Sequence, residues 1–347
     1  MTALWPWYCG FVFVFGCVST GVHPCSQDLC LLRRAFDVDS LLASKDCFTS
    51  DDADAYYTRT TDVDYRALEL CVGPGMHTVL RAPFPIAGFG GHTRQAVLVL
   101  AEVAAVAEQV DQRLVELGDH EKAGTRSNVL EVGFGRGYCT MFLAGLMPHV
   151  RFHGVDRVQR HLQLGQLACV KGGYSNVELF VGDGADFLSA VTDTVYEVVF
   201  GVESLCHLDT TAKLKTFVSN ASRRLTFPGG RLVIVDGFRS AGFASASEDH
   251  RTAMRLAECG FRIRRMPSKA EWVQEAKDAG LHLVRHTDLT SEALPFWTMG
   301  WRLARSILRL VPFVRVFGVA DNLISVTMTA QALRGAAEYG VLVFQRR

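Results

Sequence analysis

The feature that most constrains the fold of this chain is a short apolar strand that runs directly into a glycine-rich turn and then into a helix. Residues 129–137 read VLEVGFGRG, so three glycines alternate with larger residues where the apolar run ends. Glycine adopts positive φ without steric penalty and lets the backbone approach a bound molecule closely. The helix that follows presents free N–H groups in its first turn. The segment therefore predicts a ligand-binding turn between a buried strand and a helix.

Apolar strands and amphipathic helices alternate along the chain from this point. The pattern predicts five successive strands, at 128–132, 152–155, 177–181, 197–202 and 231–235. Helices are expected around them, at 94–118, 138–146, 158–171 and 211–225. Two further strands are expected near the end of the chain, at 281–285 and 339–344. Because such alternation produces right-handed crossovers, we expect an α/β fold with a doubly wound, mostly parallel, seven-stranded sheet.

Two insertions interrupt the alternation after the fifth strand. Residues 238–267 read as an irregular insertion, and residues from about 292 to 335 read as a long helical one. Insertions that follow the carboxyl ends of strands are where α/β folds build their sites. We therefore expect helical lid insertions near the binding turn.

The length and composition fit one large domain with a distinct N-terminal segment. The chain has 347 residues, 49% of them hydrophobic, which is ample for a core. Residues 4–18 are almost wholly apolar, but a membrane span needs roughly 20 such residues, so the run better resembles a signal peptide. We expect 1–24 to be an apolar targeting or anchor segment, 25–55 a poorly ordered lead-in, and 56–347 the folded domain. The apolar segment favours the secretory pathway, an organelle or a membrane, with a cytoplasmic location as the alternative.

Charge and cysteine content argue against several kinds of partner. The 36 basic side chains are balanced by 36 acidic ones, which leaves no electrostatic footprint for DNA or RNA. The ten cysteines include no CxxC pair and no spacing typical of zinc or iron–sulfur sites. We therefore expect neither a nucleic-acid partner nor a bound metal.

Two acids follow the second and third predicted strands. Asp156 lies 19 positions after Gly137, where a carboxylate can accept hydrogen bonds from ribose hydroxyls. Asp183 is placed to accept from an adenine amino group, and the small Gly184 and Ala185 leave space for the flat ring. The alternatives are a solvated strand-end acid for Asp156 and a helix N-cap for Asp183.

The fourth strand leads into an acid and a histidine. Glu203 and His207 are expected at the carboxyl edge of that strand, where they can orient an acceptor and take its proton. The alternative for His207 is a structural cap or a core histidine. A carboxylate directly after an apolar strand needs a partner, which favours a functional role for Glu203.

The glycine turn and the two acids together resemble the S-adenosylmethionine site of class I methyltransferases, a family with a Rossmann-like sheet. In that family the glycine turn lies beside the methionine part of the cofactor, the first acid binds its ribose and the second acid binds its adenine. The resemblance implies S-adenosyl-L-methionine as the cofactor. It also implies a cofactor site lined by Glu131, Gly133, Gly135, Gly137, Asp156, Asp183, Gly184 and Ala185.

The segment after the fourth strand resembles two subfamilies more closely. Glu203-Ser204-Leu205-Cys206-His207 is similar to the E-A-T-C-H segment of sterol C-methyltransferases and to the E-S-x-x-H segment of tocopherol C-methyltransferases. The order of motifs in 288–297 favours the second group. The tocopherol enzymes carry a His-His-Gly segment before the glycine turn, whereas this chain has His77 alone. The resemblance implies substrate contacts at His77, Phe296 and Trp297, and C- or N-methylation of a prenylated quinol, a sterol or an amine.

Residues 296–318 mix aromatic and aliphatic side chains with four arginines. Three interpretations stay open: a helix at a membrane surface, a lid over an apolar acceptor, and an ordinary amphipathic helix packed on the sheet. With the apolar N-terminus, the segment favours a small lipophilic acceptor, with peripheral membrane contact as a further possibility.

Two other classes of function remain as alternatives. A nicotinamide-dependent oxidoreductase uses the same kind of sheet, but its turn reads GxGxxG and the third glycine of that pattern falls on Tyr138 here. A non-catalytic adaptor built on a cofactor fold is the second alternative. The intact glycine turn and the acids Asp156 and Asp183 argue against it.

Overall fold

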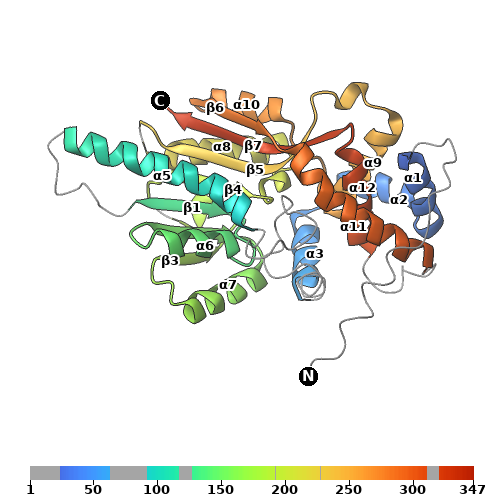
Figure 1. Cartoon of the computed structure of the whole chain (residues 1–347), viewed down its shortest axis with the longest axis horizontal. Helices are drawn as coiled ribbons and strands as arrows, with labels where there is room; N and C mark the ends of the chain where they lie inside the picture. Colours follow the sequence, from blue (N-terminus) through green and yellow to red (C-terminus); the bar gives the residue numbers. More distant parts are fainter. Residues whose placement is uncertain (1–23, 63–91, 117–126, 192, 227, 311–319) are drawn as a thin grey trace.

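The computed structural model describes residues 24–62, 92–116, 127–191, 193–226, 228–310 and 320–347 (Figure 1). The apolar segment at 1–23 and the predicted substrate contact His77 lie outside the described residues.

A seven-stranded sheet forms the centre of the fold, as the alternating pattern predicts. The strand order is β3-β2-β1-β4-β5-β7-β6, and β7 pairs antiparallel with both of its neighbours whereas the other pairings are parallel. The chain direction of the crossovers reverses between β1 and β4, which is where open α/β sheets bind their ligands. The strands are β1 (Asn128–Val132), β2 (Arg151–Asp156), β3 (Val177–Val181), β4 (Val198–Val202), β5 (Arg231–Arg239), β6 (Leu281–Asp288) and β7 (Ala337–Arg346).

Helices cover both faces of the sheet (Figure 1). One face packs against α5 (His92–Glu116) and α6 (Tyr138–Leu146), with α7 (Gln159–Gly172) alongside. The other face packs against α8 (Thr211–Arg224) and α10 (Lys269–Asp278). The central strands are buried from both sides because both faces are covered, which explains their continuous apolar sequences.

A second group of helices lies at the carboxyl edge of the sheet, on the right of Figure 1. It contains α9 (Glu248–Gly260) together with α11 (Thr290–Leu310) and α12 (Ala320–Ala332). The expected helical insertion at about 292–335 thus contains α11 and α12. The insertion at 238–267, expected to be irregular, contains the helix α9.

The N-terminal segment differs from the prediction. Residues 25–55 were expected to be a poorly ordered lead-in, but they form α1 (Pro24–Ala35), α2 (Val38–Ser44), the short 3₁₀ helix η2 (Lys45–Cys47) and the start of α3 (Ser50–Asp62). Cys25, Leu29, Leu32 and Phe36 recur at helical spacing and are buried against α9, α11 and α12. This apolar stripe is the physical reason why the segment folds onto the insertions.

Two buried carboxylates fix the N-terminal helices in place. Asp28 of α1 accepts hydrogen bonds from Trp301 Nε1 of α11 (2.5 Å) and from Gln331 Nε2 of α12 (2.6 Å). Glu258 of α9 bonds Lys45 Nζ (2.6 Å) and accepts a two-pronged contact from Arg239 (2.9 and 2.8 Å). Buried charges are retained when they are paired in this way, so the N-terminal helices belong to the folded unit.

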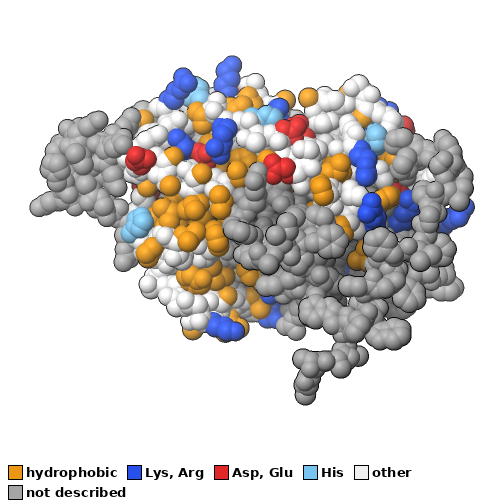
Figure 2. Space-filling view, in the orientation of Figure 1, with side chains coloured by type: hydrophobic (Ala, Val, Ile, Leu, Met, Phe, Trp, Pro, Cys, Tyr) orange, Lys and Arg blue, Asp and Glu red, His pale blue; other side chains and the backbone are white. Residues whose placement is uncertain are grey.

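The surface shown in Figure 2 carries hydrophobic side chains over the layer of α5, α6 and α7. Exposed examples from these helices are Val97, Leu146, Leu167 and Val170. Within the part of the chain that the structure describes, no helix is both long and apolar enough to cross a membrane.

Candidate active site

The glycine turn lies between β1 and α6, at the point where the crossovers reverse direction. Gly133, Gly135 and Gly137 all have positive φ, of 79°, 56° and 79°. A Cβ atom on Gly133 would lie 2.3 Å from the Cβ of Ser204, which follows β4. Both the backbone conformation and the close approach of β4 therefore require glycine at 133.

Glu131 holds the turn to the helix that follows it. This buried carboxylate accepts hydrogen bonds from the backbone N–H of Thr140 (3.0 Å) and from the Thr140 hydroxyl. Burial raises the pKa of Glu131 to about 7, against an ordinary value of 4.5. Glu131 also lines the cavity described below, so it both braces the turn and faces the predicted cofactor site.

Asp156 ends β2 and gathers three donors around the turn. Its Oδ2 accepts from the Gly135 N–H (2.8 Å), and its Oδ1 accepts from the Val158 N–H (2.8 Å) and lies 3.1 Å from His161 Nδ1. A carboxylate offers about four lone-pair positions, so one stays available for a further donor such as a ribose hydroxyl. Asp156 is therefore not a solvated strand-end acid: it is buried, lines the cavity and fixes the shape of the turn.

Asp183, Gly184 and Ala185 form the next part of the cavity rim, after β3. Asp183 is exposed, and its Oδ1 accepts from the Ala185 N–H (2.7 Å) in a local turn. The short helix that follows begins only at Phe187, with Asp186 as its N-cap residue, so Asp183 is not a helix cap. A Cβ on Gly184 would lie 3.0 Å from Val132 Cγ1. A side chain at 184 would therefore narrow the space between the glycine turn and the turn that follows β3.

Glu203 follows β4 in a left-handed conformation, with φ of 51°, which is strained for a residue with a side chain. Its Oε1 accepts from the Tyr339 hydroxyl of β7 (2.8 Å) and from Gln95 Nε2 of α5 (2.5 Å). Gln95 also contacts the Tyr339 hydroxyl. Glu203 thus joins β4, β7 and α5 at the edge of the cavity.

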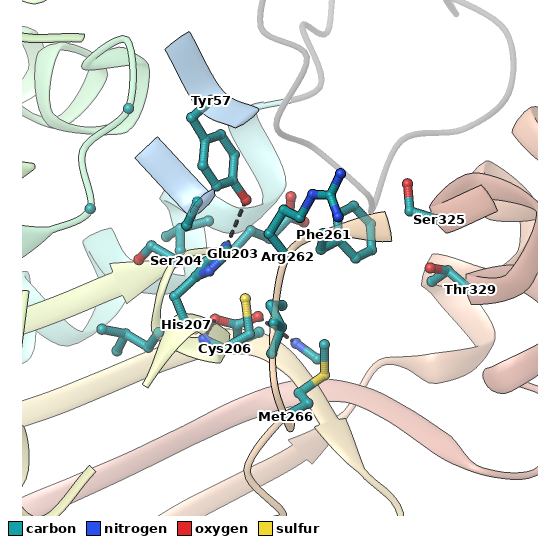
Figure 3. Close-up of a pocket in the computed structure, with 18 of the residues that line it drawn as sticks. Tyr57, Glu203, Ser204, Cys206, His207, Phe261, Arg262, Met266, Ser325 and Thr329 are labelled. Atoms are coloured by element: carbon teal, nitrogen blue, oxygen red, sulfur yellow. Dashed lines mark hydrogen bonds between the residues drawn. The ribbon is translucent and has the colours of Figure 1, made fainter. Parts of the chain in front are cut away.

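His207 ends the 3₁₀ helix η4 (Leu205–His207), and its partner comes from α3. The hydroxyl of Tyr57 lies 2.7 Å from His207 Nε2, and the two rings meet edge to face (Figure 3). Burial lowers the pKa of His207 to about 4, so its imidazole is neutral at physiological pH. A second link, between Asp54 of α3 and Arg157 after β2 (2.5 Å), holds α3 beside the glycine turn.

Asp236, within β5, is a site residue that the sequence analysis missed. Its carboxylate is buried, lines the cavity, and accepts from the backbone N–H groups of Cys206 (2.9 Å) and Gly237 (2.7 Å). Tyr57 was missed as well, because no motif surrounds it and the first part of α3 was expected to belong to the poorly ordered lead-in at 25–55. No local pattern marks Asp236, since it lies inside an apolar strand.

With the exception of Gly137, Thr140 and Asp54, these groups border one cavity of about 730 Å³. The cavity extends from the glycine turn to a mostly apolar chamber between α9, α11 and α12, with Ser325 and Thr329 of α12 facing it across from Tyr57 and His207 (Figure 3). We call this part the acceptor chamber. Its apolar lining consists of Met254, Ala257, Phe261, Ile263, Met266, Phe296, Trp297, Met299, Leu303, Ala304, Ile307, Leu323, Val326, Ala332 and Leu333.

Within the described part of residues 296–318, the position of the side chains favours the interpretation of the segment as a lid. Phe296, Trp297 and Leu303 of α11 line the cavity, which is the arrangement expected of a lid. Arg305 pairs with the buried Asp28 at 3.5 Å, so it serves the interior of the protein rather than a lipid head group. The predicted substrate contacts Phe296 and Trp297 therefore lie together in the acceptor chamber.

The residues present fit S-adenosylmethionine. Gly133 and Gly135 form a cradle without side chains at the cavity wall, and Asp156 and Asp183 both border it with unused lone-pair positions. The carboxylates around the cradle also suit a cofactor that carries a positively charged sulfur. Once bound, this cofactor supplies an activated methyl group.

The sheet order, the single antiparallel strand and the glycine turn at the switch point define the class I methyltransferase fold. Residues 129–230 match the family model described as "Methyltransferase domain". Residues 129–230 therefore match a methyltransferase domain, and the sheet that contains them has the class I methyltransferase fold.

Solved structures share this fold at low sequence identity. A geranyl diphosphate methyltransferase in complex with geranyl diphosphate and sinefungin is 19% identical, with a TM-score of 0.53 over 74% of this chain and 79% of that one. The cyclopropane synthase of Mycobacterium tuberculosis is 12% identical, with a TM-score of 0.53 over 64% and 78% of the two chains.

A third structure is an O-methyltransferase from a polyketide synthase multienzyme of Brevibacillus brevis in complex with S-adenosyl-L-homocysteine. It is 17% identical, with a TM-score of 0.50 over 75% of this chain and 81% of that one. The search of curated proteins finds no match to this sequence.

Proposed function

We propose that this chain is a methyltransferase that takes its methyl group from S-adenosylmethionine and acts on a small, predominantly apolar acceptor, which it holds in the acceptor chamber between α9, α11 and α12. The observation that carries the proposal is the continuity of the cavity, which joins the glycine turn to that chamber. An apolar chamber with a few polar groups at its inner end is typical of sites for lipophilic small molecules.

S-adenosylmethionine would supply an already activated methyl group, so alignment of the acceptor and exclusion of water would be the main tasks of the protein. Asp156 and Asp183 are the proposed contacts to the ribose and the adenine, and Phe296 and Trp297 are the proposed contacts to the apolar body of the acceptor. Tyr57, paired with His207, closes the cavity near the turn. The roles of Glu203 and His207 in catalysis stay predictions.

One matched structure supports this class of acceptor. It is a geranyl diphosphate methyltransferase in complex with geranyl diphosphate, whose hydrocarbon chain is the kind of group that an apolar chamber accommodates. None of the matched structures described above is an oxidoreductase, and no feature of the described residues favours an adaptor. Prenylated quinols, sterols and lipophilic amines are the acceptor types to test first.

The test is a panel of lipophilic phenols, sterols and amines incubated with methyl-labelled S-adenosylmethionine, read by mass spectrometry. We expect label on apolar members and none on compact polar amines such as glycine. Label on glycine at a rate equal to that on the apolar members would contradict the proposal.

Variants of the chamber wall sharpen this test. Ala304 is buried and lines the chamber, so Ala304→Phe should fill it and raise the KM of an apolar acceptor by about tenfold or more, without changing the affinity for S-adenosylmethionine. Ile307→Ala enlarges the same wall and covers the case in which Ala304→Phe does not fold. Leu167→Ala, on the exposed side of α7, is the matched control and should change neither constant.

A further inference from the structure

The carboxylate of Asp236 has no role in holding the cofactor in the site described above, yet it is buried at the wall of the cavity. It follows the central apolar run of β5, beside η4, and it lines the cavity together with Cys206 and His207. Burial of a carboxylate costs free energy unless hydrogen bonds or opposite charges compensate for the lost solvation.

Backbone donors compensate in part. Oδ2 accepts from the Cys206 N–H and Oδ1 from the Gly237 N–H, and the Cys206 thiol and the Leu205 N–H are further donors to the same carboxylate. Burial nevertheless raises the pKa of Asp236 to about 6, against an ordinary value of 3.8. A group whose pKa lies near the working pH is well suited to accept a proton and release it again.

The titratable neighbours of Asp236 do not compete for that proton. Cys206 on η4 and Tyr339 on β7 both face it, and the pKa of each is raised well above its usual range by burial, so both stay protonated at neutral pH. The negative charge of Glu203 also raises the pKa of both of these neighbours. The surroundings of Asp236 are therefore uncharged donors together with one further carboxylate.

The other two candidates for a proton acceptor are less suited. Glu203 Oε1 already accepts from Tyr339 and Gln95, and the left-handed backbone at 203 holds the side chain in that arrangement. His207 has its pKa lowered to about 4, and its Nε2 is occupied by the Tyr57 hydroxyl. A base with so low a pKa retains a proton poorly at neutral pH.

From this geometry we infer that Asp236 accepts the proton that the acceptor loses during methyl transfer, so the acceptor carries an O–H or N–H at its nucleophilic atom. In the step, a bond forms between that atom and the methyl carbon while the bond from carbon to sulfur breaks. The electron pair stays on sulfur, which gives S-adenosylhomocysteine, and the proton passes to the Asp236 carboxylate. The inference rests on the proposed function only in assuming that the acceptor lies in the same cavity.

A spectroscopic experiment tests the inference without turnover. Protein labelled with ¹³C at the aspartate carboxyl groups is titrated in complex with S-adenosylhomocysteine, and the Asp236 signal is identified by its loss in Asp236→Asn. Added 4-nonylphenol, or N-methyldodecylamine in a parallel arm, should shift that signal and change its titration midpoint. An Asp236 signal that responds to neither probe overturns the inference, even if methyl transfer itself is observed.

Turnover provides the second measurement, with whichever of these two probes accepts label. Asp236→Asn should lower kcat by about 10²- to 10⁴-fold, remove the acidic limb of the pH profile and leave the affinity for S-adenosylhomocysteine unchanged. The control Asp278→Asn, on the exposed end of α10, should keep the wild-type profile. A purely structural role would lower the rate without moving the limb.

Cys206→Ala covers the case in which Asp236→Asn does not fold. A hydrogen bond from the Cys206 thiol lowers the pKa of Asp236, so its removal should move the acidic limb to higher pH. If the acidic limb of the pH profile stays at the wild-type pH in Cys206→Ala, the inference is contradicted. If neither probe is methylated while the Asp236 signal still responds, the choice of acceptor in the proposed function is wrong but the inference stands.

Discussion

Tyr57 of α3 and His207 of η4 share a hydrogen bond of 2.7 Å across a separation of 150 residues. The contact joins an N-terminal helix to the carboxyl edge of β4, so it closes the cavity beside the glycine turn. Because His207 is neutral, only one of its ring nitrogens carries a proton, and the phenol hydroxyl donates to Nε2 in the tautomer whose proton is on Nδ1.

Loss of that hydroxyl should weaken the closure. Tyr57→Phe keeps the ring but removes the hydrogen bond to Nε2, so we expect methyl transfer to fall by about fivefold, equivalent to one buried hydrogen bond of roughly 1 kcal/mol. Labelled S-adenosylmethionine and an accepted apolar probe provide the assay. Tyr174→Phe, outside the cavity lining, is the control, and equal rates for the two variants would count against a closing role for Tyr57.

Asp156 should matter for cofactor affinity as well as for the fold. Asp156→Asn exchanges one acceptor oxygen for a donor and removes the charge, so Gly135, Val158 and His161 lose charge-assisted bonds. Such bonds contribute about 1.5–3 kcal/mol each, and we expect the Kd for S-adenosylmethionine to rise by at least about tenfold in calorimetry. An unchanged Kd would show that the carboxylate serves the turn alone.

Two glycines separate backbone strain from steric clash. Gly133 and Gly173 have positive φ of 79° and 71°, but a Cβ on Gly133 meets Ser204 at 2.3 Å whereas a Cβ on Gly173 has no atom within 4 Å. Gly173→Ala should therefore lower the free energy of unfolding by about 1–2 kcal/mol, from strain alone. Gly133→Ala should cost more and should also impair cofactor binding. Denaturant unfolding of both variants gives the comparison, and equal losses would exclude the clash.

The buried Asp28 should fasten the N-terminal helices to the lid. Asp28→Ala leaves the donors on Trp301 and Gln331 and the charge on Arg305 without their acceptor, so we expect a loss of about 3 kcal/mol in unfolding free energy. Asp39→Ala, on the exposed side of α2, should cost almost nothing. Limited proteolysis should cut α1 faster in the first variant only; equal cutting would mean that apolar packing alone holds α1.

Glu131 makes stability depend on pH. Its pKa is about 7 in the folded protein, raised by burial above the ordinary 4.5, so the unfolded chain releases this proton first as pH rises. The contribution of Glu131 to stability is therefore full below pH 4.5 and is lost as pH rises towards about 7. Glu131→Gln should lack this dependence, so its stability relative to the unmodified protein should increase across that window. Urea unfolding at several pH values would show the trend, and a decrease would contradict it.

The sequence predicts the parts of the site that are coded locally. The glycine turn, Asp156 and Asp183 each follow a strand directly, so strand periodicity alone brings them to one edge. The N-terminal helices were missed because their apolar stripe at Cys25, Leu29 and Leu32 is diluted by polar residues, although its helical spacing is a usable signal. Asp236 could not be found in this way, because its importance depends on which loop packs against β5.

The acceptor chamber and the glycine turn are formed by different segments of the chain. The turn and its two acids lie within residues 129–185, whereas the apolar lining of the chamber comes almost entirely from 254–333. Substitutions in α9, α11 and α12 can therefore change the preferred methyl acceptor while the affinity for the methyl donor stays the same. A protein arranged in this way can acquire new acceptors over evolutionary time by remodelling its helical cover alone.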